Sequence, residues 1–168
     1  MRAAALVLVQ CVQLAACLSA RRANVGGHTR RMPAPACIAG LHYGGVAHAG
    51  VLVSSTSTAL NFYTQVLGME DETHLRNPEL PFPGAFVRAG AQQIHIMELP
   101  NPDPVSGRPE HGGRDRHVAL TIKSLGPLKD ALQQAKVPFT MSKSGRAALF
   151  CRDPDGNAFE FMETPDLV

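Results

Sequence analysis

The chain repeats one pattern of secondary structure, and this repeat constrains its fold more than any other feature. Alternating and helical spacings of apolar residues predict a strand, a helix and three strands in each half. The first half comprises 46–53, 57–69, 70–74, 85–89 and 93–99, and the second 117–122, 124–137, 138–142, 147–151 and 158–163. An internal repeat of this kind decides the architecture before any motif does. The sequence therefore predicts an α+β domain made of two βαβββ modules.

Polar residues fall at equivalent places in the two halves. His48 and His117 each open a first strand, and "IHIME" aligns with "FEFME", so that His95 matches Glu160 and Glu98 matches Glu163. Side chains alternate along a strand, so His95 and Glu98 must face opposite sides of the sheet. The repeat predicts that His95 and Glu160 point inward and that the two glutamates three residues later point outward.

Four such side chains near the axis that relates the halves predict a metal site. Three imidazoles and a carboxylate suit Fe, Mn, Co, Ni or Zn and suit Mg or Ca poorly. One strand histidine is more often an ordinary residue than a ligand, but four that coincide through a repeat favour a site. The predicted ligands are His48, His95, His117 and Glu160, and Glu98 replaces His95 if the register is shifted.

The segments "HAGVLVSSTSTALNFYTQVLGME" and "DPDGNAFEFME" resemble the signature segments of the vicinal oxygen chelate superfamily, which includes glyoxalase I, bleomycin resistance proteins and extradiol dioxygenases. The resemblance covers residues from about 45 to 164. The stretch "IHIMELPNPDPVSGRPEHGGRDRH" is also similar to glyoxalase-like proteins of plastids and cyanobacteria. The resemblance implies an eight-stranded, cup-shaped mixed sheet with flanking helices around a metal. Its ligands would come from the first and last strands of each module.

The resemblance further implies lactoylglutathione lyase-like chemistry, an isomerase or lyase reaction on a small molecule that chelates the metal through adjacent oxygens. Glu160 would move the proton. Glyoxalase I usually carries a glutamate where this chain has His95. With His48, His117 and Glu160 as ligands, an Fe(II) extradiol-type dioxygenase is an alternative, and His95 would then act beside the metal. A non-catalytic protein that binds a small ligand is the third interpretation.

Three arginines are candidates for holding an anionic group of a substrate. Arg114 and Arg116 end the linker 101–116, which is rich in proline and glycine, and Arg146 follows a glycine turn. A solvated crossover and a soluble hairpin are the alternatives. The loop 77–86 is a candidate lid over the cup, and His111 is expected at the surface. The superfamily also implies that a homodimer can complete the cup, although the two modules of one chain can equally close it.

Charge excludes a nucleic-acid partner. No acidic residue precedes Glu70, whereas five of the 16 basic residues lie in the first forty positions. The rest of the chain therefore has 11 basic residues against 14 acidic ones, without the basic surface that nucleic-acid binding needs.

The N-terminal region has the composition of a leader. Residues 1–20 resemble a signal peptide, and residues 21–43 are basic, free of acids and similar to a transit peptide. A membrane anchor is the alternative, but the apolar stretch is short and rich in alanine, so we expect no stable membrane span in the mature form. The leader predicts a chloroplast, with secretion or a mitochondrion as alternatives, and leaves a domain at 44–168. Cys151 is then the only cysteine of the domain, which predicts a buried core residue.

Overall fold

The computed structural model describes residues 42–167. The leader predicted at 1–20 and nearly all of the segment 21–43 lie outside these residues. Tyr43–Val168 forms a compact unit. Within the described residues, no helix has the length and apolar character needed to cross a membrane.

The first module has the predicted order of elements. Its sheet consists of β1 (His48–Val53), β3 (Gln92–Glu98) and β2 (Gly84–Ala89), in that order across the sheet. β1 runs parallel to β3, and β2 runs antiparallel to it. Helix α1 (Thr56–Asn61) continues as a π-helical turn, η1 (Phe62–Val66), and Gly68 follows with a φ of 68°. A positive φ favours glycine, so the predicted end of the helix is confirmed.

The strand predicted at 70–74 is reduced to a single bridge between Asp71 and Val87. The Asp71 carboxylate accepts a hydrogen bond from the backbone N–H of Thr73, 2.8 Å away. This side-chain turn competes with strand pairing, and the short 3₁₀ helix η2 (Thr73–Leu75) begins at Thr73.

The second module contains every predicted element. Its sheet has the order β4 (His117–Ile122), β7 (Ala158–Glu163), β6 (Ala148–Arg152) and β5 (Phe139–Met141), and its helix is α2 (Leu125–Gln134). A short 3₁₀ helix, η3 (Gly112–Arg114), precedes β4. The α+β fold of two modules is confirmed. The described residues hold seven strands in sheets of three and four, where the resemblance implied eight strands in one sheet.

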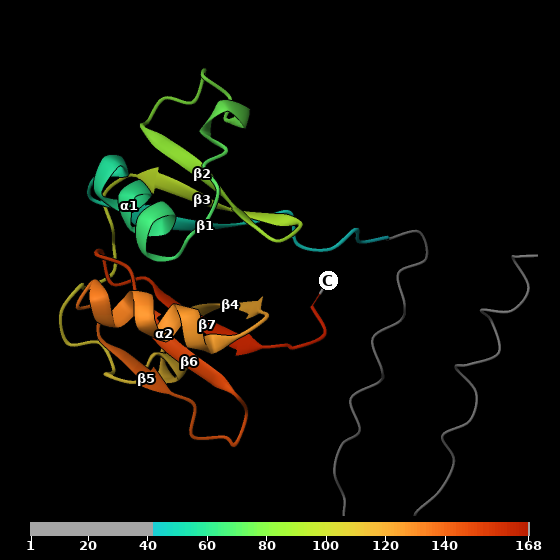
Figure 1. The fold of residues 1–168 in the computed structure, drawn as a ribbon. Coiled ribbons are helices and arrows are strands. Elements are labelled where there is room, and N and C mark those ends of the chain that lie inside the picture. The colour runs from blue at the N-terminus through green and yellow to red at the C-terminus, as the bar shows by residue number, and fades with distance from the viewer. Residues whose placement is uncertain (1–41, 168) are drawn as a thin grey trace, which may run out of the picture. The chain divides into compact units, whose positions relative to one another are not determined.

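Each sheet packs its own helix against one face (Figure 1). In the first module, Val51 and Val53 of β1 are buried in this core, whereas His48 and Gly50 alternate with them and are exposed. The strand alternation therefore leaves the opposite sheet face for polar residues.

Hydrogen bonds of the "DPDGN" loop hold the two modules together. The hydroxyl of Tyr63 in η1 donates to Asp153 of the "DPDGN" loop, 2.8 Å away. Asn157 of the same loop donates to the backbone oxygen of Leu52 in β1, at 2.9 Å. Gly156 has a φ of 84°, which confirms the predicted turn. The loop thus fixes β1 of the first module against the second module, besides making a turn.

Candidate functional site

His48 and His95 lie together on one face of the first sheet, called here the module-one face. Gly50 pairs with His95 across the parallel strands, so His48, two residues earlier, projects from the same side. The centroids of the two imidazole rings are 5.5 Å apart, and the rings are nearly perpendicular. The sheet register thus brings two residues, 47 positions apart in sequence, into one pair.

His95 is buried between aromatic rings. It stacks on Phe86 of β2, with ring centroids 4.3 Å apart, and Phe82 lies 6.1 Å away. Burial lowers the pKa of His95, and the nearby His48 and Arg76 lower it further. Its buried Nε2 has no hydrogen-bond partner among residues 42–167. A neutral imidazole with a free nitrogen is the form that binds a metal ion.

His117 and Glu160 form the second pair, on what is called here the module-two face. His117 Nε2 lies 3.2 Å from Glu160 Oε2, and His117 Nδ1 lies 2.8 Å from the backbone oxygen of Asp115. A carbonyl oxygen can only accept, so Nδ1 must carry a proton. In the neutral ring, Nε2 and Oε2 are then two acceptors that face each other. The pair needs a shared cation, either a proton or a metal ion.

The two faces are equivalent in the repeat. Phe150 pairs with Glu160 across β6 and β7, as Phe86 pairs with His95 across β2 and β3. Phe150 also contacts His117 edge-on, with ring centroids 5.5 Å apart. Each candidate pair therefore lies beside a phenylalanine at the same position of its module.

Glu160 has the features expected of a ligand or base. Its side chain is 6% exposed, and Oε1 has no hydrogen-bond partner in the described part of the chain. The nearest cation is the guanidinium of Arg146, whose Nη2 lies 3.5 Å from Oε1. A carboxylate buried this deeply is stable only with charged or hydrogen-bonding partners, and Oε1 has the Arg146 guanidinium nearby but no hydrogen bond within the described residues.

Glu98 and Glu163, which the repeat also matches, have a different task. Glu98 Oε2 accepts a hydrogen bond from the N–H of Thr56, the first residue of α1, and Glu163 Oε2 accepts one from the N–H of Leu125, the first residue of α2. Both distances are 2.7 Å. The first N–H groups of a helix lack partners within the helix and attract negative charge, so these carboxylates stabilise helix starts.

The two pairs do not form one cluster within the chain. Among residues 42–167, no group of three or more histidine, cysteine, aspartate or glutamate side chains is placed to bind a single metal ion. Each pair nevertheless offers donors that suit a first-row metal, with a free imidazole nitrogen in one and a buried carboxylate oxygen in the other. The residues fit a metal as two half-sites.

The three predicted arginines lie in different settings. Arg146 approaches Glu160, as described above. Arg116 forms an ion pair with Asp103 of the linker. Arg114 ends η3 with an exposed side chain and has no ion pair within residues 42–167. Of the three, only Arg146 contacts a candidate ligand.

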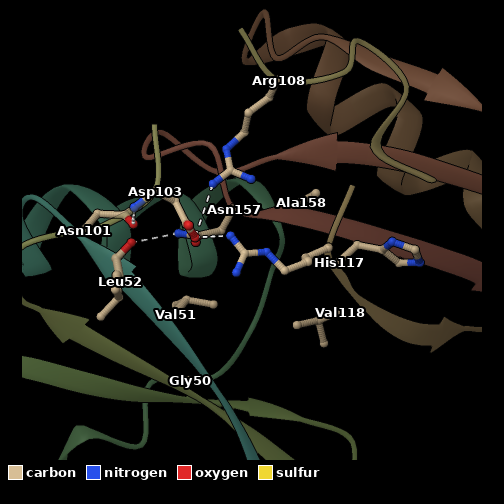
Figure 2. Close-up of a pocket in the computed structure, with 11 residues that line it drawn as sticks. Gly50, Val51, Leu52, Asn101, Asp103, Arg108, His117, Val118, Asn157 and Ala158 are labelled. Atoms are coloured by element: carbon tan, nitrogen blue, oxygen red, sulfur yellow. Dashed lines mark hydrogen bonds and ion pairs between the residues drawn. The ribbon is translucent and has the colours of Figure 1, made fainter. Parts of the chain in front are cut away.

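A cavity of about 270 Å³ is lined by residues of the edge strands β1 and β4 and of the linker. Its lining includes Arg108 and Arg116 of the linker, with Asp103 between them (Figure 2). Figure 2 shows the His117 ring directed away from Asp103 and Arg108. Arg108 also donates to Asp115, which lowers the pKa of that carboxyl to about 2. Arg108 and Arg116 are thus neutralised by aspartates, and this part of the linker is a structured crossover.

Several residues of the two faces were not predicted from the sequence. The positions of Phe86 and Phe150 depend on the sheet register, and the position of Arg76 depends on the path of a loop. His111 was expected at the surface, yet its ring lies edge-on to Phe150, 4.8 Å between centroids, and Nδ1 is 3.2 Å from Thr140 Oγ1. The neighbouring Gly112 and Gly113 could have indicated this, since a Cβ on either would meet Phe150 at 3.0–3.1 Å.

Comparisons with known proteins show the family of the chain. The family model described as "Glyoxalase/Bleomycin resistance protein/Dioxygenase superfamily" matches residues 45–161. The chain is 27% identical to Glyoxylase I 4 of Arabidopsis thaliana over 133 residues, covering 76% of this chain and 75% of that protein. It is 29% identical to the lactoylglutathione lyase of Escherichia coli O157:H7 over 125 residues, covering 71% and 92% of the two chains.

Solved structures share the fold. A glyoxalase family protein from Bacillus anthracis superposes with a TM-score of 0.60 at 24% identity, covering 74% of this chain and 98% of that one. A variant of the fosfomycin resistance protein FosX from Listeria monocytogenes, in complex with Mn(II) and 1S,2S-dihydroxypropylphosphonic acid, gives a TM-score of 0.57 at 15% identity, covering 73% and 94%.

Proposed function

Because the chain belongs to the glyoxalase/bleomycin resistance protein/dioxygenase superfamily, we propose that it is a divalent-metal-dependent lyase of the glyoxalase type. Its substrate is a small molecule that presents two adjacent oxygens to the metal. The observation that carries this proposal is the contact of His117 Nε2 with Glu160 Oε2, in which two acceptors face each other and require a cation. Relatives named as lactoylglutathione lyases support the reaction class.

The metal, one of Fe, Mn, Co, Ni or Zn, is held by His48, His95, His117 and Glu160. The four ligands come from two copies of the chain in a homodimer, with the module-one face of one copy opposite the module-two face of the other. Two observations support the sharing of the site. One chain brings no three ligands together among residues 42–167. In addition, no residue of the edge strand β4 is buried.

When bound, the metal supplies Lewis acidity, which polarises an oxygen of the substrate and acidifies the adjacent C–H bond. Glu160 Oε1 would take the proton from this carbon and return it to the neighbouring carbon, while the hydroxyl proton on the first carbon passes to the oxygen of the second, so the isomerisation consumes and releases no net proton. The backbone oxygen of Asp115 fixes the His117 ring by accepting from Nδ1. Arg146 offsets the negative charge near Glu160, and Phe86 and Phe150 limit the access of water.

Metal content and turnover test the proposal in the purified domain. We expect about one metal ion per chain and the conversion of methylglyoxal plus glutathione to the thioester. His95→Gln should lower metal content, whereas its neighbour Glu98→Gln, on the opposite face, should keep the metal and lower only the stability of α1. If only the Glu98 variant loses its metal, Glu98 and not His95 is the ligand. Turnover that stops without O2 would instead identify a dioxygenase.

Complementation tests the shared site. His48→Ala and His117→Ala each destroy every site of their own homodimer. In a mixed dimer, one site carries both changes and the other carries neither. Unfolding and refolding the two inactive variants together should therefore restore activity to about a quarter of the wild-type level, because half of the dimers are mixed and each has one intact site. Two variants that stay inactive together, although size exclusion shows that they form dimers, would show that each chain builds its own site.

A further inference from the structure

The guanidinium of Arg76 is held by contacts with Phe82 and lies beside Gly84. The guanidinium carbon lies 5.2 Å from the centre of the Phe82 ring, and Nη2 donates to the backbone oxygen of Phe82. A Cβ at Gly84 would lie 3.2 Å from Arg76 Nε and 2.4 Å from the backbone oxygen of Ile96. Glycine at position 84 therefore leaves the space in which the arginine lies. A cation over an aromatic ring with a hydrogen bond to a carbonyl is held in one orientation.

Arg76 has no carboxylate partner among residues 42–167. The other partly buried arginines, Arg108 and Arg152, both form ion pairs with Asp115 at 2.9 Å. Arg76 is also partly buried, but it forms no ion pair within residues 42–167, and its buried Nε lacks a hydrogen-bond partner there. Removing a guanidinium from water without a counter-charge is unfavourable. A fixed, uncompensated cation is therefore suited to bind an anion.

The position of Arg76 ties it to the module-one face. Phe82, which supports the guanidinium, lies 6.1 Å from His95 between ring centroids. A molecule whose oxygens lie at His95 would thus have a cation at one end.

The free N–H donors of the Arg76 guanidinium indicate which groups it can bind. The guanidinium has five N–H donors, of which Nε–H is buried and one Nη2–H donates to Phe82. The two hydrogens of Nη1 and the second hydrogen of Nη2 have no protein partner among the described residues. Free N–H groups of one guanidinium match the oxygens of a carboxylate or of a phosphonate.

We propose that Arg76 binds an oxyanion group, a carboxylate or a phosphonate, carried by the small molecule whose adjacent oxygens lie at the metal ligands. The inference deepens the proposed function and rests on it for the location of those oxygens. It assigns the anion-binding role to the loop between η2 and β2, whereas the sequence had indicated only arginines of the second half and of the linker. Arg76 then selects charged substrates over neutral ones of the same shape.

Calorimetric titration with matched acid and ester ligands tests this role. The dimeric protein is titrated with S-methylglutathione, with its diethyl ester and with methylphosphonate. We expect the wild type to bind S-methylglutathione or methylphosphonate at least about tenfold more tightly than the diethyl ester, in which both carboxylates are masked and only the ammonium charge remains, since charge-assisted bidentate bonds are the strong ones. Arg76→Gln should remove this preference, and Arg76→Lys should keep part of it. Lys123→Gln, which removes an equal charge from an exposed loop, should leave it unchanged.

The two anionic ligands distinguish the sources of the oxyanion. Preference for S-methylglutathione identifies a carboxylate, and preference for methylphosphonate identifies a phosphonate. Circular dichroism and metal content of each variant show whether the fold and the metal site persist. The inference is overturned if the wild type has no preference for an anion, or if folded Arg76→Gln keeps the preference of the wild type. Anion binding that depends on Arg76 in a protein without turnover would refute the proposed reaction and leave the subsite standing.

Discussion

Replacing Tyr63 by phenylalanine should weaken the junction between the two modules. The Tyr63 side chain is fully buried, and its hydroxyl is the only group of the first module's helical segment that donates to the buried carboxylate of Asp153 in the described structure. Asp153 also accepts from the side chain and N–H of Asn157 and from the N–H of Asp155. Loss of one donor to a buried charged group costs about 2 kcal/mol. For a domain of this size, Tm should fall by roughly 8 °C.

The loss should depend on pH in a definite direction. Burial raises the pKa of Asp153, while the hydrogen bonds from Asn157 and Tyr63 oppose this rise. Because the folded pKa is above the unfolded value, ionisation of Asp153 lowers stability as the pH rises through that interval. The Tyr63 hydroxyl stabilises the ionised form. The effect of Tyr63→Phe should therefore be larger at pH 7 than at pH 4.

Urea unfolding followed by far-ultraviolet circular dichroism measures this effect without depending on tyrosine fluorescence. The chain has two tyrosines, and Tyr43 is 89% exposed, so Tyr43→Phe is a matched control with an expected change within about 0.5 kcal/mol. Equal unfolding midpoints for the two variants at pH 7 would refute the assignment. A loss in Tyr63→Phe that grows toward pH 4 would refute the assigned charge state of Asp153.

Three further outcomes are expected. Burial raises the pKa of Cys151 to about 12, so mass spectrometry should find its thiol unmodified by iodoacetamide at pH 8 in the folded protein and alkylated in urea. Gly84→Ala places a Cβ 2.4 Å from a backbone oxygen and should lower Tm far more than Gly50→Ala, whose Cβ meets the end of a flexible methionine at 2.8 Å. The pKa of Asp115 is lowered from its ordinary value of 3.8 to about 2, so the ionised carboxylate contributes stability above pH 3.8 and this contribution is lost as the pH falls toward 2. In Asp115→Asn, stability should therefore depend less on pH in that interval.

Sequence periodicity predicted most of the fold because the apolar pattern records which side of each element is buried. The helix at 124–137 and the strands of the second module were all predicted close to their observed bounds. The strand at 70–74 was not formed as predicted, because the Asp71 side chain starts a turn there. Competition between a side-chain turn and strand pairing leaves no trace in the spacing of apolar residues, so the hydrophobic pattern could not predict it.

The register of the repeat was also contained in the sequence. Matching "IHIME" with "FEFME" placed Glu98 with Glu163, and the structure gives both the same contact with the start of a helix. That common contact explains why the third residue after His95 and after Glu160 is a glutamate in each half. The repeat thus assigned partners to residues before any distance was known.

The sequence by itself determined two βαβββ modules and a histidine or carboxylate at equivalent strand positions of each, because the spacing of apolar residues and the internal repeat can be read directly from the sequence. Only the tertiary structure decided that these residues form two pairs, and that a buried Tyr63–Asp153 contact joins the modules. It also decided that Arg76 packs on Phe82, which lies near His95, without a carboxylate partner among residues 42–167. Such contacts depend on sheet register and loop path. Segments far apart in sequence meet there, and no local pattern specifies the distance between them.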